Sequence, residues 1–218
     1  MTVDQSSRPR SRRPTPGEPT WDIAQLFPPQ GTWSVEQYLN LNTNHLVEFS
    51  DGVLEFLPMP TEFHQLLMLY IYNALKEFVL ARRLGMVMTA PMKVRVDERH
   101  FREPDVLFMR AEHASRRGNP YWDGADLVVE VVSPDDPDRD FEDKRREYAQ
   151  AGIPEYWIVD PMRRTVHVLT LTGREYVEHG RFVERGIAAS ALLDGFVVDV
   201  AKMFESVDAD RSSGRAED

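Results

Sequence analysis

The stretch that decides the fold is 127-LVVEVVSP-134, an aliphatic run with a single glutamate, Glu130, at its centre. Uninterrupted aliphatic runs of this length are typical of strands that are buried on both faces of a sheet. Burying a carboxylate in such a strand is costly unless a cation or hydrogen-bond donors meet it. The run therefore predicts a central strand, and it raises the question of which group meets Glu130.

The residues that follow predict a strand–helix–strand unit over residues 126–160. A helical pattern over residues 139–152 begins near Asp138 or Asp140, whose carboxylates are typical of a helix start. An apolar run over residues 155–160 then predicts the next strand. Units of this kind pair their strands in parallel and cross over in the right-handed sense.

The remaining elements predict a mixed sheet flanked by helices. We expect strands over residues 86–96, 104–109 and 165–172, a hairpin over 45–57 that turns at Asp51-Gly52, a weaker hairpin over 174–186, a short helix capped at Ser34 and a long amphipathic helix capped by Thr61 and ended by Gly85. The links between the earlier strands are too short for helical crossovers, so the sheet should be mixed and the fold class α/β.

Composition predicts a single domain over residues 21–205, with disordered tails at residues 1–20 and 206–218. The first tail is rich in Pro, Ser and Arg without apolar periodicity. The 218-residue chain has no cysteine, which excludes disulfides and thiolate metal sites and favours a reducing, cytoplasmic location. It shows no signal-peptide pattern, and charged residues interrupt its longest apolar segment, so we expect no membrane span.

The formal net charge is −10, and the excess of acidic residues lies outside the two tails. Proteins that bind nucleic acids usually carry a basic surface that contacts phosphates. Binding to a polyanion would therefore need a local basic patch, for which Arg82, Arg83, Arg102 and Arg145 are candidates, or a metal ion that offsets clustered carboxylates.

Two carboxylates can meet at one edge of the predicted sheet. Side chains alternate along a strand, so Glu130 lies on one face of its strand, and Asp105 lies at the start of another apolar strand. If these strands are neighbours, the carboxylates repel one another, and a hard divalent cation would relieve that repulsion. In the next helix, Lys144 and Arg145 flank the face toward the sheet, and periodicity does not choose between them as a cation for Glu130.

Four segments resemble, in this order, the Uma-two family of endonucleases in the PD-(D/E)XK restriction-endonuclease-like superfamily: SDGVLEFLPMPTEFHQ, REPDVLFM, DLVVEVVSP and DFEDKRREYAQAGIPEYWIVDP. The resemblance covers about residues 32–204. It implies that Asp105 is the motif aspartate and that Glu130 is the acid of the D/E-X-K element. Val132 stands where the superfamily has a lysine, and the resemblance implies that Lys144 takes that role. Glu48 and His64 match further positions of the pattern.

The resulting hypothesis is a restriction-endonuclease-like, Mg²⁺- or Mn²⁺-dependent endonuclease that hydrolyses phosphodiester bonds, with DNA as the expected substrate. Its catalytic residues would be Asp105, Glu130, Lys144, Glu48 and His64, and its metal ligands Asp105, Glu130 and Glu48. Each residue alone has an ordinary structural explanation, so their joint occurrence carries the prediction. A homodimer is a further hypothesis.

Two alternatives stay open. The net charge and Val132 would also suit a nuclease-like binding or regulatory module without activity. A metal phosphohydrolase that acts on small nucleotides would need no basic groove.

Overall fold

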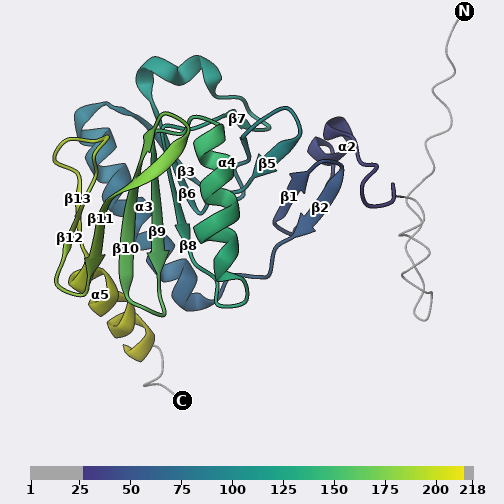
Figure 1. Cartoon of the computed structure of the whole chain (residues 1–218). Helices are drawn as coiled ribbons and strands as arrows, with labels where there is room; N and C mark the ends of the chain where they lie inside the picture. Colours follow the sequence, from purple (N-terminus) through teal and green to yellow (C-terminus); the bar gives the residue numbers. More distant parts are fainter. Residues whose placement is uncertain (1–26, 214–218) are drawn as a thin grey trace, which may run out of the picture.

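The computed structural model describes residues 27–213 (Figure 1). The tail predicted over residues 1–20 lies outside this range. The main sheet has six strands in the order β11-β10-β9-β8-β6-β3. Their bounds are β3 Gly85–Thr89, β6 Val106–Arg110, β8 Leu127–Val131, β9 Glu155–Asp160, β10 Thr165–Thr172 and β11 Glu175–Val183.

The predicted strand–helix–strand unit forms the centre of this sheet. Strands β8 and β9 pair in parallel, and every other neighbouring pair is antiparallel, which confirms the mixed α/β prediction. Between β8 and β9 the chain forms a π-helical turn, η2 (Arg139–Asp143), which continues into α4 (Lys144–Gln150). All five residues of β8 are buried, as their aliphatic character predicts.

Helices cover both faces of the sheet (Figure 1). On one face, α3 (Glu62–Arg82) packs with α5 (Val200–Ser213) over a core that includes Leu67, Ile71 and Val129. On the other face, α4 packs its residues Tyr148 and Ala149 against the other side chains of the same strands. Alternate side chains of β8 therefore pack into two separate cores, and Glu130 lies on the α4 side.

A second, smaller sheet lies beside the first and carries the predicted hairpin. Its strand order is β2-β1-β5-β4-β7, and its bounds are β1 Val47–Ser50, β2 Val53–Phe56, β4 Val94–Arg95, β5 His100–Arg102 and β7 Trp122–Asp123. The hairpin turns at Asp51 and Gly52, whose φ angles of 48° and 84° confirm the Asp-Gly turn. The short helix α2 (Val35–Leu39) begins at Ser34 with a capping box, as predicted.

Three element predictions were wrong. The strand expected over residues 86–96 divides into β3 and β4, which belong to different sheets, because Pro91 cannot donate a ladder hydrogen bond. The hairpin expected over residues 174–186 is the single strand β11. Helix α3 begins after the Thr61 cap as predicted, but it ends at Arg82 and is capped by Arg83, whose left-handed φ of 55° takes the role expected of Gly85.

The carboxyl end differs from the prediction as well. Helix α5 extends to Ser213, so residues 206–213 are helical where a disordered tail was expected, because Val207 packs into the core below α5. A two-stranded sheet of β12 (Ile187–Ala189) and β13 (Val197–Asp199) precedes this helix, and the 3-10 helix η1 (Ala111–Arg116) follows β6. Within residues 27–213, no helix combines the length and apolar character needed to cross a bilayer.

Candidate active site

Asp105 and Glu130 lie opposite each other on neighbouring strands. The register pairs Val106 of β6 with Val129 of β8, and one further step along this antiparallel ladder brings Asp105 beside Glu130. The Val131 backbone N–H donates to Asp105 Oδ2 at 2.7 Å, which fixes the aspartate at the edge of the sheet. The neighbouring strands that the sequence hypothesis required are therefore present, and they bring the two acidic residues together.

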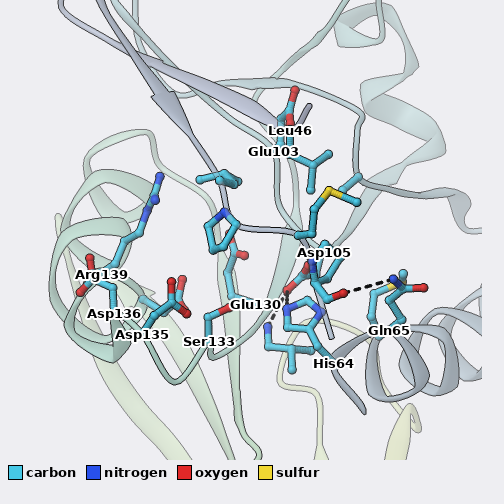
Figure 2. Close-up of a pocket in the computed structure, with 18 of the residues that line it drawn as sticks. Leu46, His64, Gln65, Glu103, Asp105, Glu130, Ser133, Asp135, Asp136 and Arg139 are labelled. Carbon is cyan, nitrogen blue, oxygen red and sulfur yellow. Dashed lines mark hydrogen bonds and ion pairs between the residues drawn. The ribbon is translucent and has the colours of Figure 1, made fainter. Parts of the chain in front are cut away.

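Both carboxylates line a cleft of about 390 Å³ where the two sheets meet the start of α3 (Figure 2). Apolar and charged residues both line the cleft. The apolar residues include Leu46, Leu57, Pro58, Met59, Pro60 and Met68; the ionisable residues include His64, Glu103, Asp105, Glu130, Asp135, Asp136, Arg139, Asp140 and Lys144. Figure 2 shows Asp105, Glu130 and His64 close together, with Arg139 on the opposite side.

A tyrosine and a lysine from α4 meet Glu130. The Tyr148 hydroxyl donates to Glu130 Oε1 at 2.6 Å, and Lys144 Nζ lies 3.0 Å from Oε2. Burial nevertheless raises the pKa of Glu130, and the carboxylates of Asp140 and Asp105 add to this effect. The glutamate is therefore satisfied in the buried strand, while the site as a whole retains an excess of negative charge.

The structure chooses Lys144 over Arg145 as the cation at Glu130. Lys144 is buried and also lies 3.2 Å from Asp140 Oδ1, whereas Arg145 donates to the Tyr176 carbonyl at 2.9 Å. Burial alone would lower the pKa of Lys144, but the nearby carboxylates outweigh burial and raise it, so the ammonium stays charged. Val132, where the resemblance led us to look for a lysine, packs in the core beneath α4.

Glu48 lies behind the cleft and does not line it. It is fully buried; Oε1 accepts from the Glu103 backbone N–H at 3.1 Å and lies 3.7 Å from Lys144 Nζ. Its Oε2 binds the Arg139 guanidinium and lies 3.4 Å from Arg102 Nη1. Burial would raise the pKa of Glu48, but these cations lower it, so the carboxylate is ionised.

His64 reaches the site from the first turn of α3. The Thr61 side chain caps this turn by accepting from the His64 backbone N–H at 3.2 Å. His64 Nε2 lies 3.2 Å from Asp105 Oδ2, and Nδ1 is buried without a hydrogen-bond partner among the described residues. Burial would lower the pKa of His64, but the hydrogen bond and charge of Asp105 raise it.

Sequence reasoning missed several residues that support the site. Asp140 was expected to cap the helix, but it forms no cap hydrogen bond and instead pairs with Lys144 from a buried position. Arg102 was expected to contact phosphates, but it is buried, and its Nε and Nη2 donate to Glu147 at 2.6 and 2.8 Å. The spacing of four residues between Asp140 and Lys144 could have indicated the first pair. The contact of Arg102 joins the smaller sheet to α4 across 45 residues, so neither periodicity nor a local motif could have revealed it.

The residues of the cleft fit a hard divalent cation. Among residues 27–213, no three His, Asp or Glu side chains are already grouped as a metal site. Asp105 and Glu130, however, both line an open cleft with their carboxylates; burial raises the pKa of Glu130, and the carboxylates of Asp140 and Asp105 raise it further. Carboxylate and water oxygens are the ligands that Mg²⁺ and Mn²⁺ prefer, and Mg²⁺ sites commonly use one or two carboxylates.

Comparison with solved structures finds a protein of similar fold. A structure described as a "putative nuclease belonging to DUF820" from Anabaena variabilis is similar at 17% sequence identity, with a TM-score of 0.66 over 79% of this chain and 97% of that one. That likeness concerns the fold. No protein with a curated description matches the chain.

A family comparison covers the same segments as the site. The Uma2 family, described as "Putative restriction endonuclease", matches residues 35–201, a range that contains Glu48, His64, Asp105, Glu130 and Lys144. This match spans most of the 218 residues and confirms the resemblance drawn from the four sequence segments. The chain therefore belongs to the Uma2 family and has a restriction-endonuclease-like fold.

Proposed function

We propose that the protein is a metal-dependent endonuclease that hydrolyses phosphodiester bonds, with DNA as substrate. One observation carries the proposal: Asp105 and Glu130 face each other at an open cleft, with the Lys144 ammonium 3.0 Å from Glu130. The family supports a nuclease in general; the metal and the DNA are our additions.

In this proposal Asp105 and Glu130 would hold one Mg²⁺ or Mn²⁺ ion. When bound, such an ion would act as a Lewis acid and would lower the pKa of a water molecule that it binds. We assign Glu48, which sequence reasoning made a third ligand, to holding Lys144 and Arg139, because cations and an amide already occupy its oxygens.

The chain's own residues supply positioning and charge. Lys144 stays protonated in its buried position and stabilises negative charge that develops on a phosphate in the cleft. His64 lines the cleft and contacts Asp105 through Nε2, so we assign it to assisting proton transfer there; its other ring nitrogen, Nδ1, is buried. The Tyr148 hydroxyl holds Glu130 in place from behind.

The test is nicking of supercoiled DNA by the purified protein. We expect nicking with Mg²⁺ or Mn²⁺ and none in EDTA, and we expect Glu130→Gln to abolish it while the thermal unfolding transition survives. Glu112→Gln is the matched control, because Glu112 is exposed and lies outside the cleft. Nicking that persists in EDTA or in Glu130→Gln would contradict the proposal.

One observation favours a second candidate, a phosphohydrolase that acts on small nucleotides. The cleft cations Arg139 and Lys144 are both paired with carboxylates, so the described part of the cleft offers no unpaired Lys or Arg to track a polyanion. Parallel assays with nucleoside triphosphates, single-stranded DNA, duplex DNA and RNA separate the candidates. Hydrolysis of nucleotides without nicking of any polymer would favour the second candidate.

The remaining expectations concern activity and assembly. Calorimetry with Mn²⁺ and no nucleic acid tests the inactive binding module, because a protein without an active site should show no saturable binding that depends on Asp105. We retain the homodimer and the cytoplasmic location as proposals. Light scattering tests the dimer, and a monomer at working concentration would contradict it.

A further inference from the structure

The ammonium group of Lys144 lies close to three carboxylates beside the cleft. Lys144 Nζ lies 3.0 Å from Glu130, 3.2 Å from Asp140 and 3.7 Å from Glu48. The Lys144 side chain is only 7% exposed, so water cannot readily replace a partner that it loses. A metal cation that binds Glu130 must therefore displace the Lys144 ammonium from this carboxylate. The displacement is easier where another carboxylate retains the ammonium.

Asp140 lies where it can retain that ammonium. It is 6% exposed, and the buried Tyr156 hydroxyl of β9 donates to its backbone carbonyl at 2.9 Å. The Lys144 backbone N–H closes the π-helical turn by donating to the Arg139 carbonyl. Turns of this type are frequent at functional sites. The turn thus holds the Asp140 carboxylate beside Lys144, independently of Glu130.

We propose that Asp140 is a positioning residue that retains Lys144 when a divalent cation binds Glu130. The inference rests on the proposed function, and it adds a residue that sequence reasoning assigned to helix capping. In the metal-free protein the ammonium bridges Glu130 and Asp140. When the cation binds, Lys144 keeps its contacts with Asp140 and Glu48, remains in the cleft and faces the phosphate. Asp140 acts through Lys144 and contacts neither substrate nor metal.

A simpler role for Asp140 would be a negative charge that attracts the cation from a distance. The two roles differ in whether the effect of Asp140 depends on Lys144. A double-mutant cycle measures that dependence, because coupled residues give non-additive changes. The cycle comprises wild type, Asp140→Asn, Lys144→Met and the double variant. Isothermal titration calorimetry with Mn²⁺, without nucleic acid, gives the Kd of each.

Asp140→Asn should raise the Kd for Mn²⁺ by about tenfold, the low end of the usual effect of residues that support a metal ligand. The reason is that Lys144 then competes more strongly for Glu130. Lys144→Met should bind Mn²⁺ at least as tightly as wild type. In the Lys144→Met background, Asp140→Asn should change the Kd by less than about twofold, the scatter of additive sites. Asp143→Asn is the control, because exposed Asp143 pairs with exposed Arg146.

If Asp140→Asn weakens Mn²⁺ binding equally in wild type and in Lys144→Met, the inference is overturned, while the proposed metal site is not. Wild-type protein that shows no saturable Mn²⁺ binding would overturn the proposed function and the inference with it. Thermal unfolding checks that each variant folds, and Lys144→Gln replaces Lys144→Met if the latter loses a cooperative transition. Asp140→Glu keeps the carboxylate and should restore most of the affinity; affinity as low as that of Asp140→Asn would count against retention of Lys144.

Discussion

The role of Glu48 can be tested by replacing it with glutamine, which has the same shape and no charge. Glu48 is fully buried among three cations, Lys144, Arg102 and Arg139. A glutamine oxygen can still accept from the Glu103 backbone N–H, which lies 3.1 Å from Oε1. Glu48→Gln therefore removes the charge and leaves the local packing and the backbone hydrogen bond in place.

The size of the loss in the free energy of unfolding depends on which carboxylate partners each cation keeps in Glu48→Gln. Breaking a buried ion pair costs about 3–5 kcal/mol because the other charge is left uncompensated. Here Arg102 keeps Glu147 at 2.6 Å, Arg139 keeps Glu55 at 2.9 Å, and Lys144 keeps its other partners. The loss should therefore lie at the low end of that range, about 3 kcal/mol. For a domain of this size, a loss of about 3 kcal/mol lowers the melting temperature by about 6–12 °C.

Thermal and urea unfolding of wild type, Glu48→Gln and Glu55→Gln measure this difference. Glu55 contacts the same two arginines, but its side chain is 32% exposed, so its replacement should cost no more than about 1 kcal/mol. Saturable Mn²⁺ binding should survive in Glu48→Gln. A melting temperature like that of Glu55→Gln would refute the supporting role of Glu48, and loss of Mn²⁺ binding in a folded variant would return Glu48 to the metal ligands.

Three further predictions concern the groups around the site and the hairpin. Asp105→Asn keeps an oxygen that accepts from the Val131 N–H, so the variant should retain its cooperative thermal transition. It loses the negative charge that we assign to metal binding, so calorimetry should show no saturable Mn²⁺ binding. Binding of Mn²⁺ as in wild type would contradict the assignment of Asp105 as a ligand. Tyr148→Phe removes the hydroxyl that donates to Glu130 and should lower the free energy of unfolding in urea by about 1.5–3 kcal/mol, whereas an unchanged midpoint would mean that the hydroxyl is dispensable. Gly52→Ala should cost about 1–3 kcal/mol, because φ is 84° and the new Cβ would lie 2.8 Å from the Gly31 carbonyl oxygen; Gly173→Ala, with positive φ but open space, should cost less.

The local patterns predicted most of the fold because they reflect local physics. The alternation in β8 correctly separated the face of Glu130 from the face packed under α3, and the Asp-Gly pair located the hairpin. The same alternation brought Asp105 and Glu130 to one face, and the sheet register made them neighbours. Errors arose where tertiary context decides, as in β11, which was expected to be part of a hairpin although it pairs with β10 along its full length.

The charged residues around the site were harder to predict for a physical reason. An arginine buried between two sheets and an arginine in solvent look alike in a sequence, because their fate depends on acidic residues far along the chain. Arg102 lies 45 residues before Glu147, and Arg139 lies 91 residues after Glu48. Helical periodicity left Lys144 and Arg145 equivalent, and only the position of α4 over β8 separates them.

The valine at position 132 follows from the same arrangement. A lysine there would have to leave the core that Val132 fills beneath α4, next to Tyr148. Lys144 approaches Glu130 from the helix instead, and the π-helical turn, held by Tyr156, supplies it with a second carboxylate in Asp140. The ammonium on the helix has partners independent of Glu130, and our proposal that Glu130 binds a metal ion while Lys144 stays in the cleft depends on those partners.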